Sequence, residues 1–181
     1  TSVIYNPILI NDEKPASNSY NYKEPFQIVT VGRLIPVKNQ KCIIESISLL
    51  SNKFYLNLYG EGELLNALNT YATKLKIDKR VTFHGNVNNV KNFIVKSHCF
   101  VLSSLTEGFP NVVLEAMSVG LPVICSNCMT GPLELLNDNE NIPIKKGEFV
   151  KAKYGLLVNV DDALAILKAR YKSSFLAVEN G

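Results

Sequence analysis

The sequence lacks the features that mark membrane-spanning and nucleic-acid-binding proteins. No apolar run approaches the roughly 18 residues that a transmembrane helix needs. Lysine and arginine form no tract, and the formal net charge is only +3. This distribution of charge argues against nucleic acid as the main partner. Any contact with a membrane is therefore expected to be peripheral.

Histidine and cysteine are also sparse, with two and four copies in 181 residues. His84 and His98 lie far apart in sequence and are interpreted as structural. Cys125 and Cys128 have a C-x-x-C spacing, but neither a second pair nor a nearby histidine accompanies them. We interpret these thiols as small hydrophobic residues in a reducing compartment. Because no carboxylate cluster suggests a divalent cation either, we expect neither a metal nor another cofactor.

What the sequence does contain is a regular alternation of strand and helix patterns. The expected strands are 26–32, 54–60, 81–85, 99–104, 122–126 and 154–158, and the expected helices are 39–51, 61–76, 88–96, 110–119, 130–136 and 161–176. Most strand runs are apolar throughout, which is typical of strands buried on both faces. The pattern predicts an α/β fold with a doubly wound, Rossmann-like parallel sheet. Segment 137–153 is interpreted as a surface insertion.

In such a sheet, ligands bind beyond the C-terminal ends of the strands. Arg33 and Lys38 follow the first strand and suit phosphate oxygens, although a solvated surface pair explains them equally well. Gly60 and Gly62 follow the second strand, but Leu65 stands where a dinucleotide fingerprint has its third glycine. We therefore expect a tight turn that allows close approach to a ligand, and we disfavour a dinucleotide-dependent oxidoreductase.

The stretch "EGFPNVVLE" places two glutamates around the start of a helix. Pro110 suits the first helical turn, so the backbone N–H groups of 108–112 are expected to favour an anion. Glu107 stands before this helix and Glu115 about one turn inside it, where a carboxylate needs a hydrogen-bonding partner. Both carboxylates suit the vicinal hydroxyls of a polyhydroxylated ligand. The alternatives are a capping role for Glu107 and a buried structural contact for Glu115.

The stretch "MTGPLELL" repeats this arrangement after the next strand. Thr130 and Gly131 form a turn, and Glu134 enters a short helix. We interpret the hydroxyl of Thr130 as a helix cap, because threonine is favoured at that position.

Taken in order, these stretches resemble the C-terminal half of retaining glycosyltransferases of family 4, which adopt the two-domain GT-B fold. The resemblance runs from Gln27 to about Val158, and Glu107 and Glu115 have the E-x7-E spacing of that family. It rests on six segments in register: "VGRLIPVKN", "LYGEGEL", "VTFHGNV", "FVLSSLTEGFPNVVLEAMSVGLPVICS", "GPLELL" and "YGLLV".

The resemblance implies a role for each candidate residue. Glu115 would bind the ribose of a nucleotide-sugar, and Glu107 would contact hydroxyls of the sugar near the anomeric carbon. Arg33 and Lys38 would hold the diphosphate, and Glu107, Arg33 and Lys38 form the catalytic set. The remaining donor-binding residues would be Gly32, Gly85, Asn86, Val87, Gly108, Phe109, Pro110, Asn111 and Val112.

The resemblance also implies an activity and a domain plan. A sugar would pass, with retained configuration, from a nucleotide-sugar to a glycan or lipid-linked acceptor in bacterial surface polysaccharide or lipid-linked glycan synthesis. A UDP-sugar is favoured over a GDP-sugar, and no metal is needed. Residues 1–24 would form an interdomain linker and 25–181 the donor domain, with the N-terminal acceptor domain outside this chain. Alone, the chain would be inactive.

The implied location is the cytoplasm, at the inner face of the cytoplasmic membrane. The basic insertion 137–153 is longer than the family's usual connection, and we interpret it as a solvated loop. An alternative function is a non-catalytic nucleotide-sensing or interaction module. The presence of Arg33, Lys38, Glu107 and Glu115 together argues against this alternative.

Overall fold

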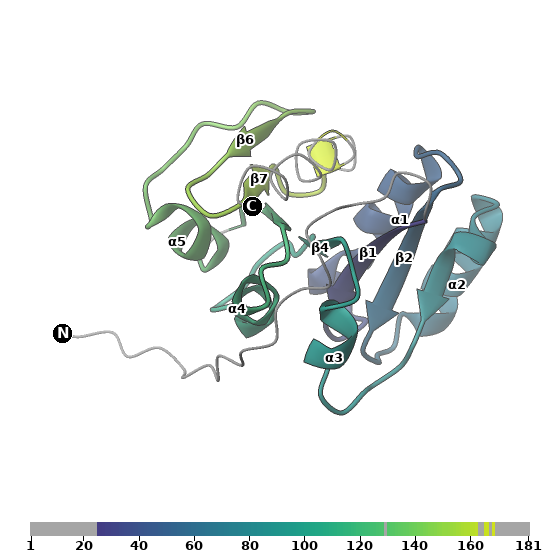
Figure 1. The fold of residues 1–181 in the computed structure, drawn as a ribbon. Coiled ribbons are helices and arrows are strands. Elements are labelled where there is room, and N and C mark those ends of the chain that lie inside the picture. The colour runs from purple at the N-terminus through teal and green to yellow at the C-terminus, as the bar shows by residue number, and fades with distance from the viewer. Residues whose placement is uncertain (1–24, 129, 163–164, 167, 169–181) are drawn as a thin grey trace.

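The computed structural model describes residues 25–128, 130–162, 165–166 and 168. Seven strands form one sheet in the order β3-β2-β1-β4-β5-β7-β6, and only the β6–β7 pair is antiparallel. The strands are β1 (Phe26–Val31), β2 (Phe54–Tyr59), β3 (Val81–Phe83), β4 (Cys99–Leu102), β5 (Val123–Ser126), β6 (Phe149–Lys151) and β7 (Leu156–Val158). The predicted doubly wound α/β fold is confirmed (Figure 1).

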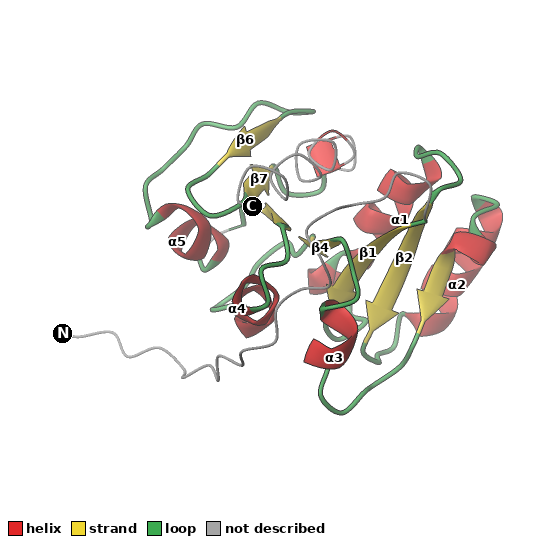
Figure 2. Cartoon of the chain, in the orientation of Figure 1, coloured by secondary structure: helices red, strands yellow, loops and turns green. Residues whose placement is uncertain are grey.

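Helices cover both faces of this sheet (Figure 2). The α-helices are α1 (Gln40–Ser48), α2 (Leu65–Lys74), α3 (Lys91–Ile94), α4 (Asn111–Ser118) and α5 (Pro132–Asn137), and the 3-10 turns are η1 (Pro36–Lys38) and η2 (Asp78–Arg80). Apolar residues of α1 and α2 pack in one core cluster, and those of α3, α4 and α5 pack in the other. The chain thus winds to one side of the sheet and then to the other.

The strands divide their side chains between these two core clusters. In β4, Val101 belongs to the α1 and α2 side, whereas Phe100 belongs to the α4 side. Ile124 and Cys125 of β5 are divided in the same way, and all four side chains are buried. Since alternate residues of a strand point to opposite faces, burial on both faces explains why these runs are apolar throughout.

The loops after β1 and β2 pack backbone against backbone. A Cβ atom placed on Gly60 would lie 2.2 Å from the carbonyl oxygen of Gly32, and one on Gly62 would lie 2.3 Å from that of Leu34. Leu34 also donates its N–H to the carbonyl of Glu61 at 2.8 Å. We expected a ligand to approach these two glycines closely, but the neighbouring loop of the same chain occupies that space instead.

The structure corrects three expected elements. Strand β6 lies inside the segment 137–153 that we expected to be a surface insertion, because an antiparallel turn pairs Val150 with Leu157 at the sheet edge. The helix expected over 61–76 begins only at Leu65, since the residues before it bond to the Leu34 loop. The helix expected over 88–96 is confined to Lys91–Ile94. The expected linker 1–24 and most of the helix 161–176 lie outside the described residues.

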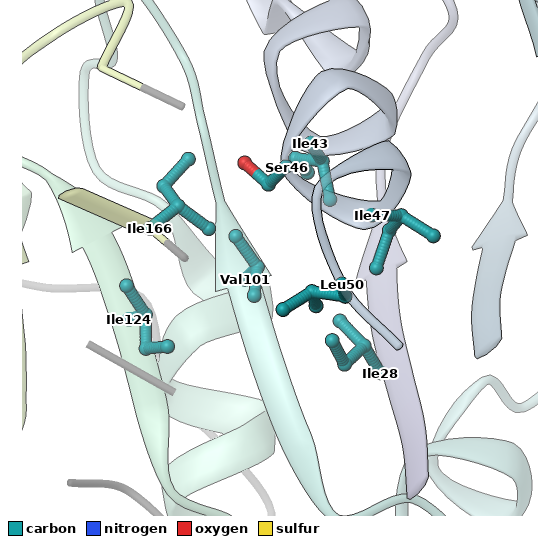
Figure 3. Close-up of a pocket in the computed structure, with 8 residues that line it drawn as sticks. All are labelled: Ile28, Ile43, Ser46, Ile47, Leu50, Val101, Ile124 and Ile166. Atoms are coloured by element: carbon teal, nitrogen blue, oxygen red, sulfur yellow. The ribbon is translucent and has the colours of Figure 1, made fainter. Parts of the chain in front are cut away.

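A cavity of about 10 Å³ lies inside the core, on the α1 side of the sheet (Figure 3). The eight residues around it are Ile28, Ile43, Ser46, Ile47, Leu50, Val101, Ile124 and Ile166. Ile166 closes one side, so the segment after β7 contributes to this core. Ligand sites have volumes of hundreds of cubic ångströms, which makes this cavity a packing gap.

Candidate functional site at the switch point of the sheet

The candidate residues meet where the order of the strands reverses. β1 lies between β2 and β4, so the connection after β1 winds to one side of the sheet and the connection after β4 to the other. In open α/β sheets, the crevice at this reversal is the usual ligand site. Arg33 and Lys38 follow β1, and Glu107 follows β4. The fold therefore brings together residues that are about 70 positions apart in sequence.

An ion pair joins the loop after β1 to the loop after β4. Lys38 Nζ lies 2.6 Å from Glu107 Oε1, and their side chains are 22% and 8% exposed. Ser104 Oγ donates to the same oxygen at 2.6 Å. A carboxylate this deeply buried needs such donors, because desolvation without them is costly. Glu107 is thus held by its neighbours and does not act as a helix cap.

Hydroxyl groups fix the loop that carries Glu107. Ser103 Oγ lies 2.9 Å from the carbonyl oxygens of both Lys38 and Asn39, which ties the end of β4 to the loop after β1. Ser126 Oγ, at the end of β5, donates to the carbonyl of Ser104 at 2.6 Å. Sequence reasoning missed these residues. The only available signal was serine at the ends of the apolar runs "CFVLSS" and "PVICS".

The predicted capping role of Thr130 is wrong. Gly131 is the N-cap of α5, and no side chain caps that helix. Thr130 instead donates its hydroxyl to the main-chain carbonyl of Glu107. Thr130 has a positive φ of 64°, in the left-handed region that residues other than glycine seldom adopt. The "MTGP" turn therefore supports the Glu107 loop.

Arg33 reaches solvent beside Lys38. Arg33 is exposed, and no described residue accepts a hydrogen bond from its guanidinium. Its main-chain carbonyl accepts a hydrogen bond of 2.9 Å from Gln40 Nε2, and Gln40 is buried. The loop is therefore held through its main-chain carbonyl, while the Lys38 side chain reaches Glu107. Gln40 is a second supporting residue that sequence reasoning missed.

The start of α4 faces the same region. Pro110 is the N-cap, no side chain caps the helix, and no acidic residue occupies its first turn. No described acceptor is found for the amides of Gly108 and Val112. A Cβ atom on Gly108 would meet nothing within 4 Å, whereas one on Gly131 would lie 2.6 Å from Pro110. The loop is thus packed on the α5 side and open at Gly108, as an anion-accepting helix start requires.

Glu115 lies one turn inside α4 and is half-buried. No described residue donates to its carboxylate; its main-chain carbonyl accepts from Ser118 Oγ at 2.8 Å. We expected a hydrogen-bonding partner for the Glu115 carboxylate, and the described part of the chain does not supply one. Glu115 is available to accept hydrogen bonds from a ligand.

The loop 85–87 lies at the end of β3. Gly85 accepts a hydrogen bond of 2.7 Å from the N–H of Gly60, and the N–H of Asn86 lies 3.4 Å from Glu61 Oε1. Val87 packs against the α4-side core. On the other flank, Phe109 and Leu114 line an open groove between α4 and α5. The predicted donor residues thus lie along one edge of the sheet, from the end of β3 to the start of α4.

Comparison with known proteins assigns the family. The family model described as "Glycosyl transferases group 1" matches residues 12–159, which is more than half of the chain. The chain belongs to this family. An uncharacterized glycosyltransferase of Methanocaldococcus jannaschii is 38% identical over 149 residues, which cover 80% of this chain and 37% of that relative.

Two further group 1 relatives have more informative names. An Escherichia coli protein named "UDP-Gal:alpha-D-GlcNAc-diphosphoundecaprenol alpha-1,3-galactosyltransferase" is 34% identical over 184 aligned positions, covering 93% of this chain and 43% of that protein. The apo structure of the lipopolysaccharide outer core galactosyltransferase WaaB superposes with a TM-score of 0.77 and 27% identity, covering 98% of this chain and 47% of that one. The fold thus matches GT-B glycosyltransferase structures, and the chain spans about two fifths of the length of the curated relatives.

The histidines and cysteines of this group 1 chain have structural surroundings. His84 stacks on Tyr59 at 4.3 Å between ring centroids, and His98 Nδ1 accepts the N–H of Gln27 at 2.9 Å. Burial raises the pKa of the Cys125 and Cys128 thiols. Within the described residues, no group of three or more His, Cys, Asp or Glu side chains could hold a metal ion. The described helices are all too short or too polar to cross a membrane.

Proposed function

We propose that this chain is the donor-binding half of a retaining, family 4 glycosyltransferase. The whole enzyme transfers a hexose from a nucleotide-sugar to a glycan or lipid-linked acceptor. The observation that carries this proposal is the Lys38–Glu107 pair at the switch point, where a cation and a carboxylate lie together at the ends of β1 and β4. The alternative of a nucleotide-sensing module keeps the same binding site without the transfer.

The roles follow from charge and position. Arg33, Lys38 and the start of α4 stabilise the diphosphate as the bond to the anomeric carbon breaks, because preorganised positive groups act where negative charge develops. Glu115 accepts from the ribose hydroxyls, and Glu107 orients the sugar. Since these groups supply the positive charge, we propose that the reaction needs no metal.

UDP is the proposed nucleotide, with GDP as the alternative. The name of the Escherichia coli relative states a UDP-sugar donor and a lipid-linked acceptor, and this supports the choice. We propose that the acceptor is bound by a domain outside the matched region, since the chain spans about two fifths of the length of its curated relatives, and that the chain alone does not catalyse transfer. A lipid-linked acceptor would place the whole enzyme in the cytoplasm, at the inner face of the cytoplasmic membrane.

Calorimetric titration of the 181-residue chain with UDP, GDP and ADP tests the proposal. We expect selective binding of UDP and a loss of about tenfold or more in Glu115→Ala, because a charged acceptor of two hydroxyl groups is removed. Glu134→Ala, a glutamate on α5, serves as the matched control and should bind UDP like the wild type. Equal binding of all three nucleotides, or an unchanged Glu115→Ala, would contradict the proposal.

A further inference from the structure

The two carboxylate oxygens of Glu107 differ in what they contact. Oε1 accepts from both Lys38 Nζ and Ser104 Oγ, each at 2.6 Å. A carboxylate oxygen has about two lone-pair positions, so these two donors fill Oε1. No described residue donates to Oε2. A ligand therefore finds one occupied oxygen and one open oxygen on this side chain.

The hydroxyl of Ser104 is itself fixed by its surroundings. Ser104 is fully buried at the end of β4, and its single hydroxyl proton is donated to Glu107. Its main-chain carbonyl is held by Ser126 Oγ at 2.6 Å, from the neighbouring strand β5. Three residues further on, the main-chain carbonyl of Glu107 accepts from Thr130. The loop 104–107 is thus held at both ends, which limits the rotation of the carboxylate.

We propose that Ser104 is a positioning residue for the sugar of the donor. Together with Lys38 it commits Oε1 of Glu107 to the protein and presents Oε2 to a sugar hydroxyl. With Oε1 occupied, Glu107 cannot accept hydrogen bonds from a vicinal diol through both of its oxygens. It accepts one sugar hydroxyl through Oε2, and the position of Oε2 selects the direction from which that hydroxyl approaches. This inference rests on the proposed function, because it assigns the sugar contact to Glu107.

The test compares the affinities of UDP and UDP-galactose for each variant by calorimetry. Ser104→Ala should lower the affinity for UDP-galactose about fivefold relative to UDP, because the carboxylate loses one of its two donors and can rotate. Its affinity for UDP itself should stay within about twofold of the wild type, since the diphosphate and ribose contacts remain.

Ser126→Ala is the matched control. It removes a buried hydroxyl of the same size from the next strand, and that hydroxyl bonds to the main-chain carbonyl of Ser104 and to the Cys128 side chain, with no described contact to the Glu107 carboxylate. A merely structural role for Ser104 would make both alanine variants change the two affinities in parallel. Ser104→Thr keeps a hydroxyl and should restore the preference for UDP-galactose.

A double-mutant cycle with Glu107→Ala keeps the inference falsifiable if single variants lose stability, because alanine removes the acceptor that Ser104 positions. In the Glu107→Ala background, Ser104→Ala should have no further effect on the ratio of the two affinities. An equal effect in both backgrounds, or an unchanged ratio in Ser104→Ala, would overturn the role of Ser104. By contrast, an unchanged ratio in Glu107→Ala would overturn the sugar contact itself, and with it that part of the proposed function.

Discussion

The loops on the two sides of the switch point are held in different ways. The loop after β1, which carries Arg33 and Lys38, packs its backbone directly against the turn at Gly60 and Gly62. The loop after β4, which carries Glu107, is held by side-chain hydroxyls from the end of β5 and from the turn before α5. Side chains of Gln40 and Ser103 also bond to carbonyls of the loop after β1, but its close packing on the turn at Gly60 and Gly62 requires that those two positions have no side chain.

This difference has a functional consequence. Backbone packing fixes the loop after β1, from which the long side chains of Arg33 and Lys38 extend. Hydrogen bonds to the carboxylate and carbonyl of Glu107, one of them from Lys38, fix the acidic side chain in place. In the proposed function, the fixed acceptor is the group that would choose among sugar hydroxyls, because that choice depends on orientation.

The largest effect is expected from Gly60→Ala, which breaks the backbone contact. The new Cβ would lie 2.2 Å from the carbonyl of Gly32, and Gly60 has a φ of 128° that side chains disfavour. We expect a loss of about 3 kcal/mol in the free energy of unfolding, measured by urea denaturation. The control is Gly108→Ala, which meets open space and should change stability by less than about 0.5 kcal/mol. Equal stabilities of the two variants would contradict backbone packing.

A smaller effect is expected from Lys38→Met, which breaks the contact between the two loops. The Glu107 side chain, only 8% exposed, would lose its cation but keep the hydrogen bond from Ser104. Because Lys38 is partly solvated, we expect a loss of about 2 kcal/mol in the free energy of unfolding, below the range for a fully buried pair. Urea denaturation at neutral pH measures this loss.

The control for this variant is Lys153→Met. Lys153 pairs with Asp138 through side chains that are 57% and 51% exposed, so its removal should leave the unfolding midpoint unchanged. A loss of stability in Lys153→Met as large as that in Lys38→Met would show that burial does not set the strength of these pairs.

The sequence predicts the main features of this site because they depend on local pattern. Apolar runs identified the strands, and their alternation with helices predicted a parallel sheet with the ligand residues beyond the C-terminal ends of its strands, where Lys38 and Glu107 meet. The supporting contacts depend on tertiary structure instead. Ser103 bonds to carbonyls 64 and 65 positions away, and Thr130 bonds to one 23 positions away. No spacing in the sequence signals such pairs. Local propensity predicted that Thr130 caps α5, whereas its hydroxyl bonds to the main chain of Glu107.

Strand β6 was missed for a related physical reason. Its residues, "FVK", are half-buried or exposed at the sheet edge, so they lack the apolar run that identified the other strands. Pairing with Leu157 in β7 creates this strand, and pairing is a property of the fold. The glycines show another case, because Gly60 and Gly62 predicted a close approach to a ligand, whereas the structure places the Leu34 loop against them.

The smallest effect is expected on the pH dependence of stability, and it concerns a histidine side chain near the Gly60 turn. His84 follows β3, stacks on Tyr59 and lies 2.8 Å from Asn57 Oδ1, and burial lowers its pKa. Unfolding restores the ordinary value of about 6.5, so below that pH the unfolded chain binds a proton that the folded chain resists. Stability should therefore fall slightly as the pH drops from 7.5 to 5.5. In His84→Gln this part of the fall in urea midpoint should disappear. Identical pH dependence in both proteins would show that His84 is too solvated to contribute.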